Sequence, residues 1–151
     1  MLGREGSYIA ITQAVANSFK VEILTATHNF TVTTGHTFKL ALYTSSAVMS
    51  KDTTAYSATN EVGNSGTYSA GGGTLTSATP VLSTDTAVCD FGDISFTSAT
   101  ITARGALIYN SSVSNKACVV LDFGADKTCT AGTFTITFPA PDASNAIIRV
   151  A

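Results

Sequence analysis

The strongest constraint on the fold comes from a strict alternation of apolar and polar side chains near the C-terminal end. In residues 133–138, phenylalanine or isoleucine occupies every second position and threonine fills the positions between them. This period of two is typical of an antiparallel strand with one face in a core and the other in water. Shorter apolar runs broken by turn residues occur at 74–82, 86–91, 94–96, 100–109, 117–123 and 146–150. We therefore predict a mainly β fold, an antiparallel β-sandwich or jelly-roll-like domain.

The length of the chain favours one domain. A chain of 151 residues is ordinary for one β domain and short for two. It should bury roughly 70% of the surface that its unfolded form exposes, which is enough for a core without disulfide or metal support. Residues 1–10 show no periodicity and predict an extended N-terminal arm. Residues 11–151 are then a single β-sandwich domain with a short helix near its start.

One amphipathic helix is predicted between residues 11 and 30. Val15, Phe19 and Ile23 recur every four residues, with polar side chains between them. Ser18 or Thr12 could supply the capping oxygen at the N-terminus. The two caps place the first helical residue differently, so the pattern predicts the helix without fixing its start.

The next segments predict a strand followed by a long loop. Residues 37–43 alternate as a strand does when one face lies in the core. Residues 44–73 are rich in serine, threonine, glycine and asparagine, and predict a partly ordered loop with one helical turn near residues 54–58. The triplet Gly71, Gly72 and Gly73 has no lysine after it, which argues against a phosphate loop. It is expected to give the backbone freedom where the loop enters a strand.

Composition excludes several classes of partner. The eight Lys and Arg and ten Asp and Glu residues are scattered singly, and charged residues make up 12% of the chain, about half the usual share. Without a basic stripe, nucleic-acid binding is not expected. The longest apolar runs fall far short of the roughly 20 residues of a membrane helix, and residues 1–8 contain no apolar segment of a secretory signal. We predict neither membrane insertion nor export by that route.

The cysteines and carboxylates favour structural roles. Cys89, Cys118 and Cys129 are an odd set without a CxxC pair, which predicts reduced and mostly buried thiols. Two clusters place carboxylates around a Phe-Gly step, Asp90 with Asp93 and Asp122 with Asp126. A calcium ion needs six to eight oxygen ligands, so these clusters favour structural turns, and ion binding is left open.

No catalytic residue and no cofactor is predicted. His28 and His36 are the only histidines, and no serine lies in a nucleophile elbow. A hydrolase would need a site centred on one of these histidines. Arg104 lies in an otherwise apolar strand pattern, which is typical of the solvent side of a strand and compatible with an interface anchor.

Several segments resemble a group of small β-rich virion structural proteins of tailed bacteriophages. They are FKLALYTSS at 38–46, TAYSATNEV at 54–62, ITARGALIYN at 101–110 and the end of the chain from residue 138. The resemblance covers most of the chain beyond about Ser18. It implies a part of the phage particle more firmly than it implies which part, and it carries over no catalytic or cofactor-binding residue.

These considerations predict a non-enzymatic protein that decorates and stabilises the capsid. It is expected to bind the outer surface of the major capsid protein lattice, to form a homo-oligomer and, after synthesis in the host cytoplasm, to reside in the virion. The predicted contacts are one face of the sandwich with Arg104, and the arm residues Leu2, Arg4, Tyr8 and Ile9. The alternatives are a tail or head-fibre module that binds host glycans, and a tail-tube or connector component. The absence of tryptophan and of long repeats argues against a fibre.

Overall fold

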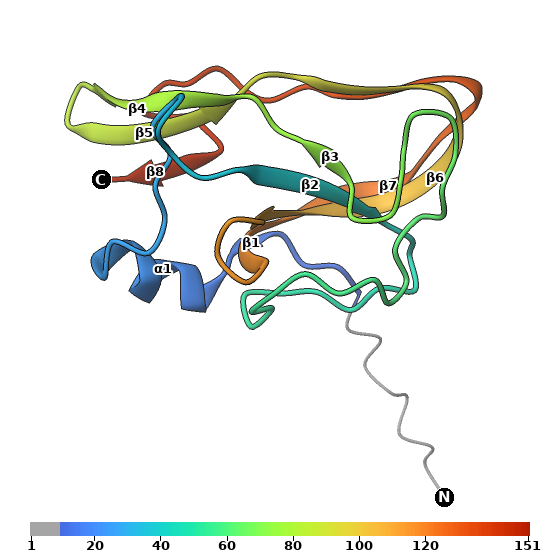
Figure 1. Ribbon diagram of the computed structural model, residues 1–151, viewed down its shortest axis with the longest axis horizontal. Coiled ribbons are helices and arrows are strands. Elements are labelled where there is room, and N and C mark those ends of the chain that lie inside the picture. Colours follow the sequence, from blue (N-terminus) through green and yellow to red (C-terminus); the bar gives the residue numbers. More distant parts are fainter. Residues whose placement is uncertain (1–9) are drawn as a thin grey trace, which may run out of the picture.

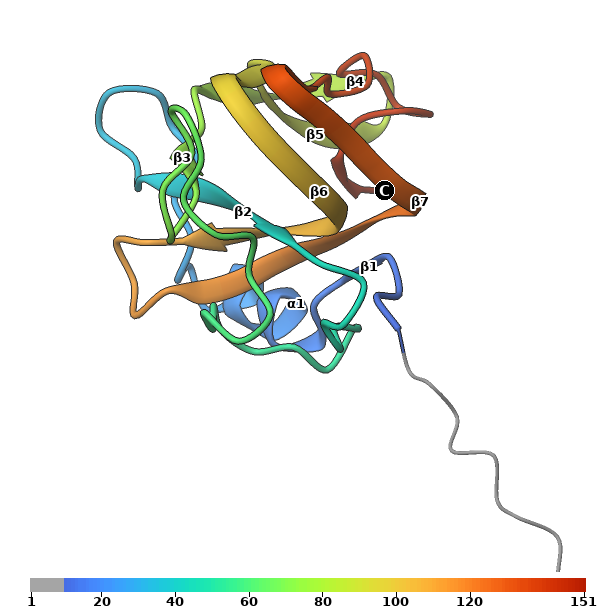
Figure 2. The ribbon, with the colours of Figure 1, turned by 90° about the vertical axis from the view of Figure 1, so that its right-hand side faces the viewer.

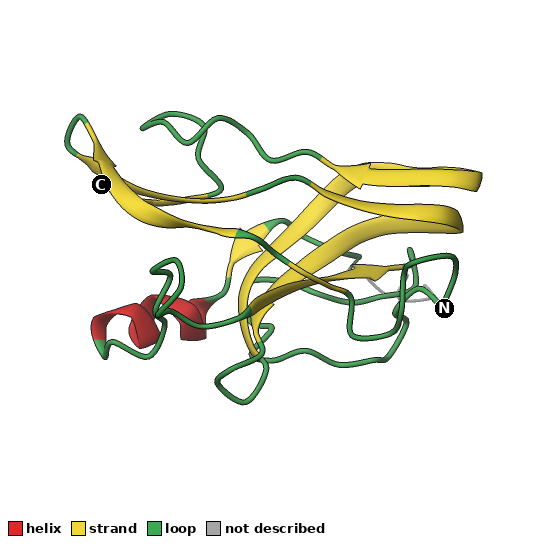
Figure 3. Ribbon diagram, turned by 45° about the horizontal axis from the view of Figure 1, so that its top comes forward, coloured by secondary structure: helices red, strands yellow, loops and turns green. Residues whose placement is uncertain are grey.

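A computed structural model describes residues 10–151 and shows a mainly β fold of two antiparallel sheets (Figures 1 and 3). Within these residues there is one helix, which packs at one end of the molecule. The predicted fold class is therefore confirmed. Residues 1–9, with the predicted contacts Leu2, Arg4, Tyr8 and Ile9, lie outside the described residues.

The two sheets contain five and three strands. The larger sheet has the order β1-β7-β6-β2-β3 and the smaller one the order β4-β5-β8. The elements are β1 (Ala14–Val15), α1 (Asn17–Leu24), β2 (Phe38–Tyr43), β3 (Gly73–Thr74), β4 (Ser77–Ser83), β5 (Thr86–Phe91), β6 (Ile94–Asn110), β7 (Lys116–Ile136) and β8 (Ile148–Val150).

A long bent hairpin of β6 and β7 connects the two layers. The sequence runs at 94–96 and 100–109 join into β6, and those at 117–123 and 133–138 fall largely in β7, so the prediction of separate strands was wrong. The register of the pair shifts at four places, the first between Phe96 and Ala99, where Ser98 has a φ of 52°. Such bulges bend a strand without ending it. Figure 2 shows both ribbons rising from the layer of β1 and β2 toward that of β4 and β5.

The core fills the space between the layers with aromatic and aliphatic side chains. The rings of Phe30 and Phe38 stack with centroids 4.2 Å apart, and Phe91 lies 5.8 Å from both Phe38 and Phe138. In residues 133–138, Phe134 and Phe138 are buried while the intervening threonines are exposed. This confirms the half-buried strand that the alternation predicted.

The start of α1 is fixed by tertiary contacts and not by a capping side chain. Ala16 is the N-cap, and its N–H donates to the Cys118 carbonyl over 2.9 Å. Both predicted caps were wrong, because Thr12 lies before β1 and Ser18 lies inside the helix, where its hydroxyl is buried without a hydrogen-bond partner among the described residues. Val15 belongs to β1 because it pairs with Val119 of β7.

The segment 44–73 forms a cover over the outer face of β2. The alternation predicted one buried face, but the side chains of Ala41 and Tyr43 on the other face are buried as well. The Tyr43 hydroxyl donates to the Ser57 carbonyl over 2.7 Å. The helical turn predicted near residues 54–58 is absent, since Ala55 forms a β-bridge with Lys116 there. The polar loop thus makes β2 a strand buried on both faces.

The glycine triplet lets the cover pass close to β2. Gly72 has a φ of +72°, and a Cβ at this position would lie 1.9 Å from the Leu40 carbonyl oxygen. Only glycine fits this close approach in the left-handed region. The prediction that the triplet provides backbone freedom at the entry to a strand is confirmed, since β3 begins at Gly73.

Candidate functional site

Arg104 is held by carboxylates of the neighbouring strand. Its Nε lies 3.5 Å from Asp122 Oδ1, and its Nη1 lies 3.8 Å from Asp126 Oδ1. The side chain is 32% exposed, so the charge is partly neutralised within the molecule and only part of it faces solvent. An interface anchor at this position remains a prediction.

The two carboxylate clusters act as turn and strand supports. Asp122 Oδ1 accepts the N–H of Gly124 over 2.9 Å, and Asp93 Oδ1 accepts the N–H of Phe138 over the same distance. Residues 10–151 contain no group of three or more histidine, cysteine or acidic side chains arranged for a metal ion. Asp93 lies in the connection between β5 and β6, as the sequence favoured, whereas Asp90 lies within β5 and Asp122 and Asp126 lie within β7.

The three thiols are free, as predicted. Cys89 and Cys118 are buried, Cys129 is half-buried, and none forms a disulfide within the described chain. Burial raises the pKa of the Cys89 thiol to about 12, and the nearby Asp90 adds to this shift. Burial also raises the pKa of the Cys118 thiol well above its ordinary value. Both buried thiols therefore stay protonated at neutral pH, which makes them poor nucleophiles.

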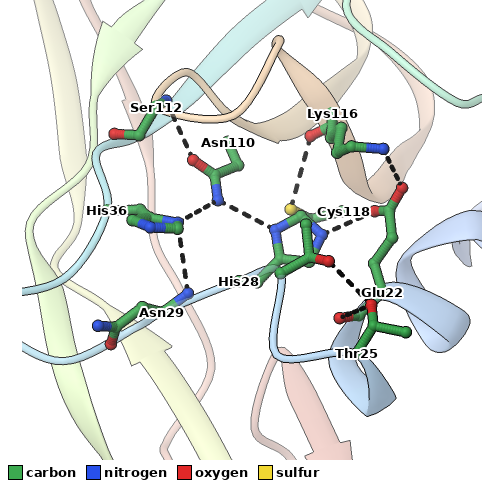
Figure 4. A network of polar contacts seen from close by, with 10 residues as sticks. Glu22, Thr25, His28, Asn29, His36, Asn110, Ser112, Lys116 and Cys118 are labelled. Atoms are coloured by element: carbon green, nitrogen blue, oxygen red, sulfur yellow. Dashed lines mark hydrogen bonds and ion pairs between the residues drawn. The ribbon is translucent and has the colours of Figure 1, made fainter.

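A buried polar network joins the two histidines to Asn110, which is far from both in the sequence (Figure 4). Asn110, at the end of β6, is fully buried, and its amide Nδ2 donates to His28 Nδ1 over 3.0 Å and to His36 Nδ1 over 2.9 Å. Its Oδ1 accepts the N–H of Ser112 over 3.1 Å, which fixes the orientation of the amide. Both Nδ1 atoms must therefore be unprotonated acceptors.

The network continues from His28 to the helix and to β7. The proton of His28 lies on Nε2, which donates to Glu22 Oε2 over 2.7 Å. The other oxygen of Glu22 accepts from Lys116 Nζ over 2.6 Å. Burial acts to raise the pKa of Glu22, but hydrogen bonds from Lys116 and His28 and the charge of Lys116 outweigh it and hold this pKa below its ordinary value.

This arrangement ties the helix and the following loop to the large sheet. The side chain of His28 is 0% exposed, and both of its ring nitrogens already have partners. No serine hydroxyl among the described residues bonds to either histidine. The geometry supports a structural link, and it gives no support to the His-centred hydrolase site considered from the sequence.

The Glu22 contacts are expected to stabilise the fold at neutral pH and to lose this effect in acid. Because the pKa of Glu22 is lower in the folded state than in the unfolded state, its contribution is present above the unfolded value and is lost as the pH falls through the folded value. We expect Glu22→Gln to be less stable than the wild type at neutral pH, with the gap closing below about pH 4. Urea unfolding from roughly pH 3 to pH 7 measures this. An unchanged gap across that range would contradict the assignment, and Asp85→Asn, at an exposed turn, is the matched control.

A second feature is an exposed apolar surface between α1 and the small sheet. The α1–β8 surface comprises the exposed side chains of Leu24, Leu82 and Val150, with the half-buried Ile23 and the buried Ile148 in the groove between α1 and β8. Leu24 is 88%, Leu82 71% and Val150 53% exposed. Leu82 and Val150 both pair with Ala87 of β5, so these two side chains share one face of the sheet. A groove of about 390 Å³ lies between α1 and β8.

The α1–β8 surface ends at an open strand edge. β8 is the last strand of the order β4-β5-β8, so its outer edge has no partner strand within residues 10–151. Figure 1 shows α1, β4, β5 and β8 at the same end of the molecule. Exposed apolar side chains grouped beside an open edge are typical of protein interaction sites.

The sequence pattern did not reveal this surface. Leu24 continues an apolar helix pattern and Val150 a strand pattern, and such residues are usually buried. Their exposure depends on how α1 and the small sheet are placed in the fold.

Comparisons with protein-family models, with curated proteins and with solved structures find no match to this chain. The one helix within residues 10–151 is too short to cross a membrane.

Proposed function

We propose that this chain is a structural protein of a tailed-bacteriophage virion that decorates the capsid by binding the outer surface of the major capsid protein lattice. The resemblance of four sequence segments to small phage virion proteins supports the virion assignment. The β-sandwich fold and the low content of charged residues are compatible with broad contact to a coat surface. In this proposal the protein stabilises the shell and transforms no molecule.

The observation that carries the proposal is the α1–β8 surface. Leu24, Leu82 and Val150 are three of the six large apolar side chains among the described residues that expose more than half of their area, and the other three are Val21, Val48 and Val81. Burial of apolar area contributes roughly 25 cal/mol per Å², so a partner that covers these residues gains stability, and Lys20 and Arg149 at the same groove can pair with acidic groups of that partner. We therefore assign the coat-binding face to this surface.

A capsid-binding assay with matched variants tests the proposal. Purified protein is mixed with capsids that lack it, and the bound fraction is measured after sedimentation. The double variant Leu24→Glu with Leu82→Glu should weaken binding by at least about tenfold, or roughly 1.4 kcal/mol, because both carboxylates would be buried in the contact. Val48→Glu replaces an equally exposed apolar residue in the 44–73 cover and should leave binding unchanged.

The outcomes separate the capsid role from the alternatives. Wild-type protein that fails to sediment with capsids, or a double variant that binds as well as the wild type, would contradict the proposed face. Binding of the wild type to host cells or to a glycan array would favour an adhesion module instead. The contribution of the arm is measured in the same assay with residues 2–9 deleted.

A further inference from the structure

The outer edge of β7 is a long strand edge without a partner. β1 pairs with β7 only at Val119 and Val120, so the edge from Phe123 to the strand end at Ile136 has no neighbouring strand within residues 10–151. None of the backbone hydrogen bonds made outside regular helices and strands involves residues 123–136. Such an edge presents rows of free N–H and C=O groups that can pair with another chain.

The β6 edge on the opposite side of the hairpin differs from the β7 edge, because residues of the 44–73 cover form hydrogen bonds to it. Thr97 and Thr67 exchange hydrogen bonds, since the Thr67 N–H donates to the Thr97 carbonyl and the Thr97 N–H donates to the Thr67 hydroxyl. The Thr100 N–H donates to the Ser65 hydroxyl over 2.8 Å. The cover segment thus blocks one side of the hairpin and leaves the other open.

A groove with an apolar floor lies along the open edge. Its volume is about 470 Å³, and its lining comes entirely from β7 and the residue that follows it. Phe123 and Phe134, with ring centroids 6.5 Å apart, line it together with Ile136 and Cys129. Lys127 is the one cation among the lining residues. Threonines complete the lining, so an extended segment with spaced apolar side chains fits this site.

The described part of the chain begins beside this edge but turns away from it. β1 runs antiparallel to β7, with Ala14 opposite Val120. The Gln13 side chain accepts the N–H of Asp122 over 3.3 Å, so it takes the place that a longer β1 would use. The Thr12 N–H donates to the Met49 carbonyl over 2.8 Å, so the backbone has already left β7. Within the described residues, the segment before β1 therefore does not pair with the β7 edge beyond Val120.

We propose that residues 1–9 of one copy dock as an added β-strand on the outer edge of β7, residues 123–136, of a neighbouring copy. Nine extended residues span about 30 Å, and the 14-residue edge is about 45 Å long, so the segment fits within it. In an extended segment Leu2 and Tyr8 lie on the same face, so both apolar side chains can enter the groove. This inference does not depend on the capsid assignment, because it concerns contacts between copies of this chain alone.

Disulfide trapping tests the inference with a thiol that the groove already contains. Cys129 lines the groove and is half-buried. Three full-length variants are made, Leu2→Cys, Gly6→Cys and Tyr8→Cys, and each is oxidised separately. At least one variant should form a disulfide-linked dimer through Cys129 at a level at least about tenfold above the control, because docking raises the effective concentration of the two thiols.

Two controls make each outcome decisive. Asp85→Cys places a thiol on the exposed β4–β5 turn and gives the background level of random cross-linking. Adding Cys129→Ser to the cross-linking variant should abolish the dimer. A disulfide within one chain, identified by peptide mass spectrometry, would contradict docking on a neighbouring copy. Cross-linking at background level in all three variants would contradict it as well.

Sedimentation velocity provides a second measurement without any new cysteine. Full-length protein should self-associate, and the variant that lacks residues 2–9 should sediment as a monomer with an unchanged circular dichroism spectrum. Self-association that survives the deletion, or a full-length chain that is monomeric at all concentrations, would also overturn the inference. Neither result bears on capsid sedimentation, so this inference and the capsid proposal can fail separately.

Discussion

Replacing Glu61 with alanine is expected to lower the free energy of unfolding by roughly 3–4 kcal/mol, because its carboxylate accepts three hydrogen bonds that are each worth more than a neutral one. Tyr56 and Tyr68 donate to it over 2.6 and 2.7 Å, and the Gly71 N–H donates over 2.8 Å. Burial raises the pKa of both tyrosines, and the Glu61 charge raises it further, so the phenols remain donors. Glu61 therefore holds distant parts of the 44–73 cover together, and it positions the Tyr68 hydroxyl, which accepts the N–H of Leu42 in β2 over 2.8 Å.

Thermal unfolding measures this loss. For a domain of this size the expected change corresponds to a fall in Tm of roughly 10 °C. Glu61→Gln keeps the shape and one acceptor oxygen and should lose less than Glu61→Ala. Asp85→Ala removes an exposed carboxylate and should change Tm little. The account of the cover is wrong if Glu61→Ala is no more destabilised than Asp85→Ala.

Replacing Asn110 with alanine is the second change for which we expect a large effect, with a loss of roughly 3–5 kcal/mol. The substitution leaves the Nδ1 atom of His28 and the N–H of Ser112 without their partner, and it leaves His36 Nδ1 with only the N–H of Asn29 at 3.4 Å. It also opens a space at a position that is 0% exposed. Equilibrium urea unfolding compares the variant with the wild type.

The isosteric variant Asn110→Asp separates the hydrogen-bond pattern from packing. An aspartate fills the same space but cannot donate to the two imidazoles at neutral pH. At neutral pH it should therefore be less stable than the wild type although it opens no space. A variant as stable as the wild type would show that the orientation assigned to the amide is incorrect.

Strands whose two faces differ were predictable from the sequence. Residues 86–91 were predicted as a strand and form β5, and the Thr-Phe alternation at 133–138 marks the buried and exposed faces correctly. These patterns depend on local burial alone, which side-chain periodicity records. The role of Gly72 was also predictable, because a glycine cluster at the start of a strand indicates a backbone conformation that other residues rarely adopt.

Features set by distant partners were not predictable. The sequence of β6 contains polar positions such as Thr97 and Ser98, which suggest a break between two strands. In the structure β6 is one strand, and β-bulges occur at these positions. Ala16 replaces the expected cap because the strand partner Cys118 supplies the hydrogen bond. Both errors arise because an antiparallel partner far along the chain decides the local conformation.

The sequence contains no local pattern that predicts the Asn110 network or the α1–β8 surface. Asn110 meets His28 and His36 across separations of 82 and 74 residues. The exposure of Leu24 likewise follows from the position of α1 relative to β8 and not from its own sequence neighbours. No periodicity, motif or spacing in one sequence carries information about such pairings.

The central claim is tested most directly by a cryo-electron microscopy map of purified phage particles whose genome encodes this chain. The account predicts β-sandwich density on the outer coat surface, with the α1–β8 surface turned toward the major capsid protein. Particles that lack this chain, or a map that places it in the tail or fibres, would contradict the account.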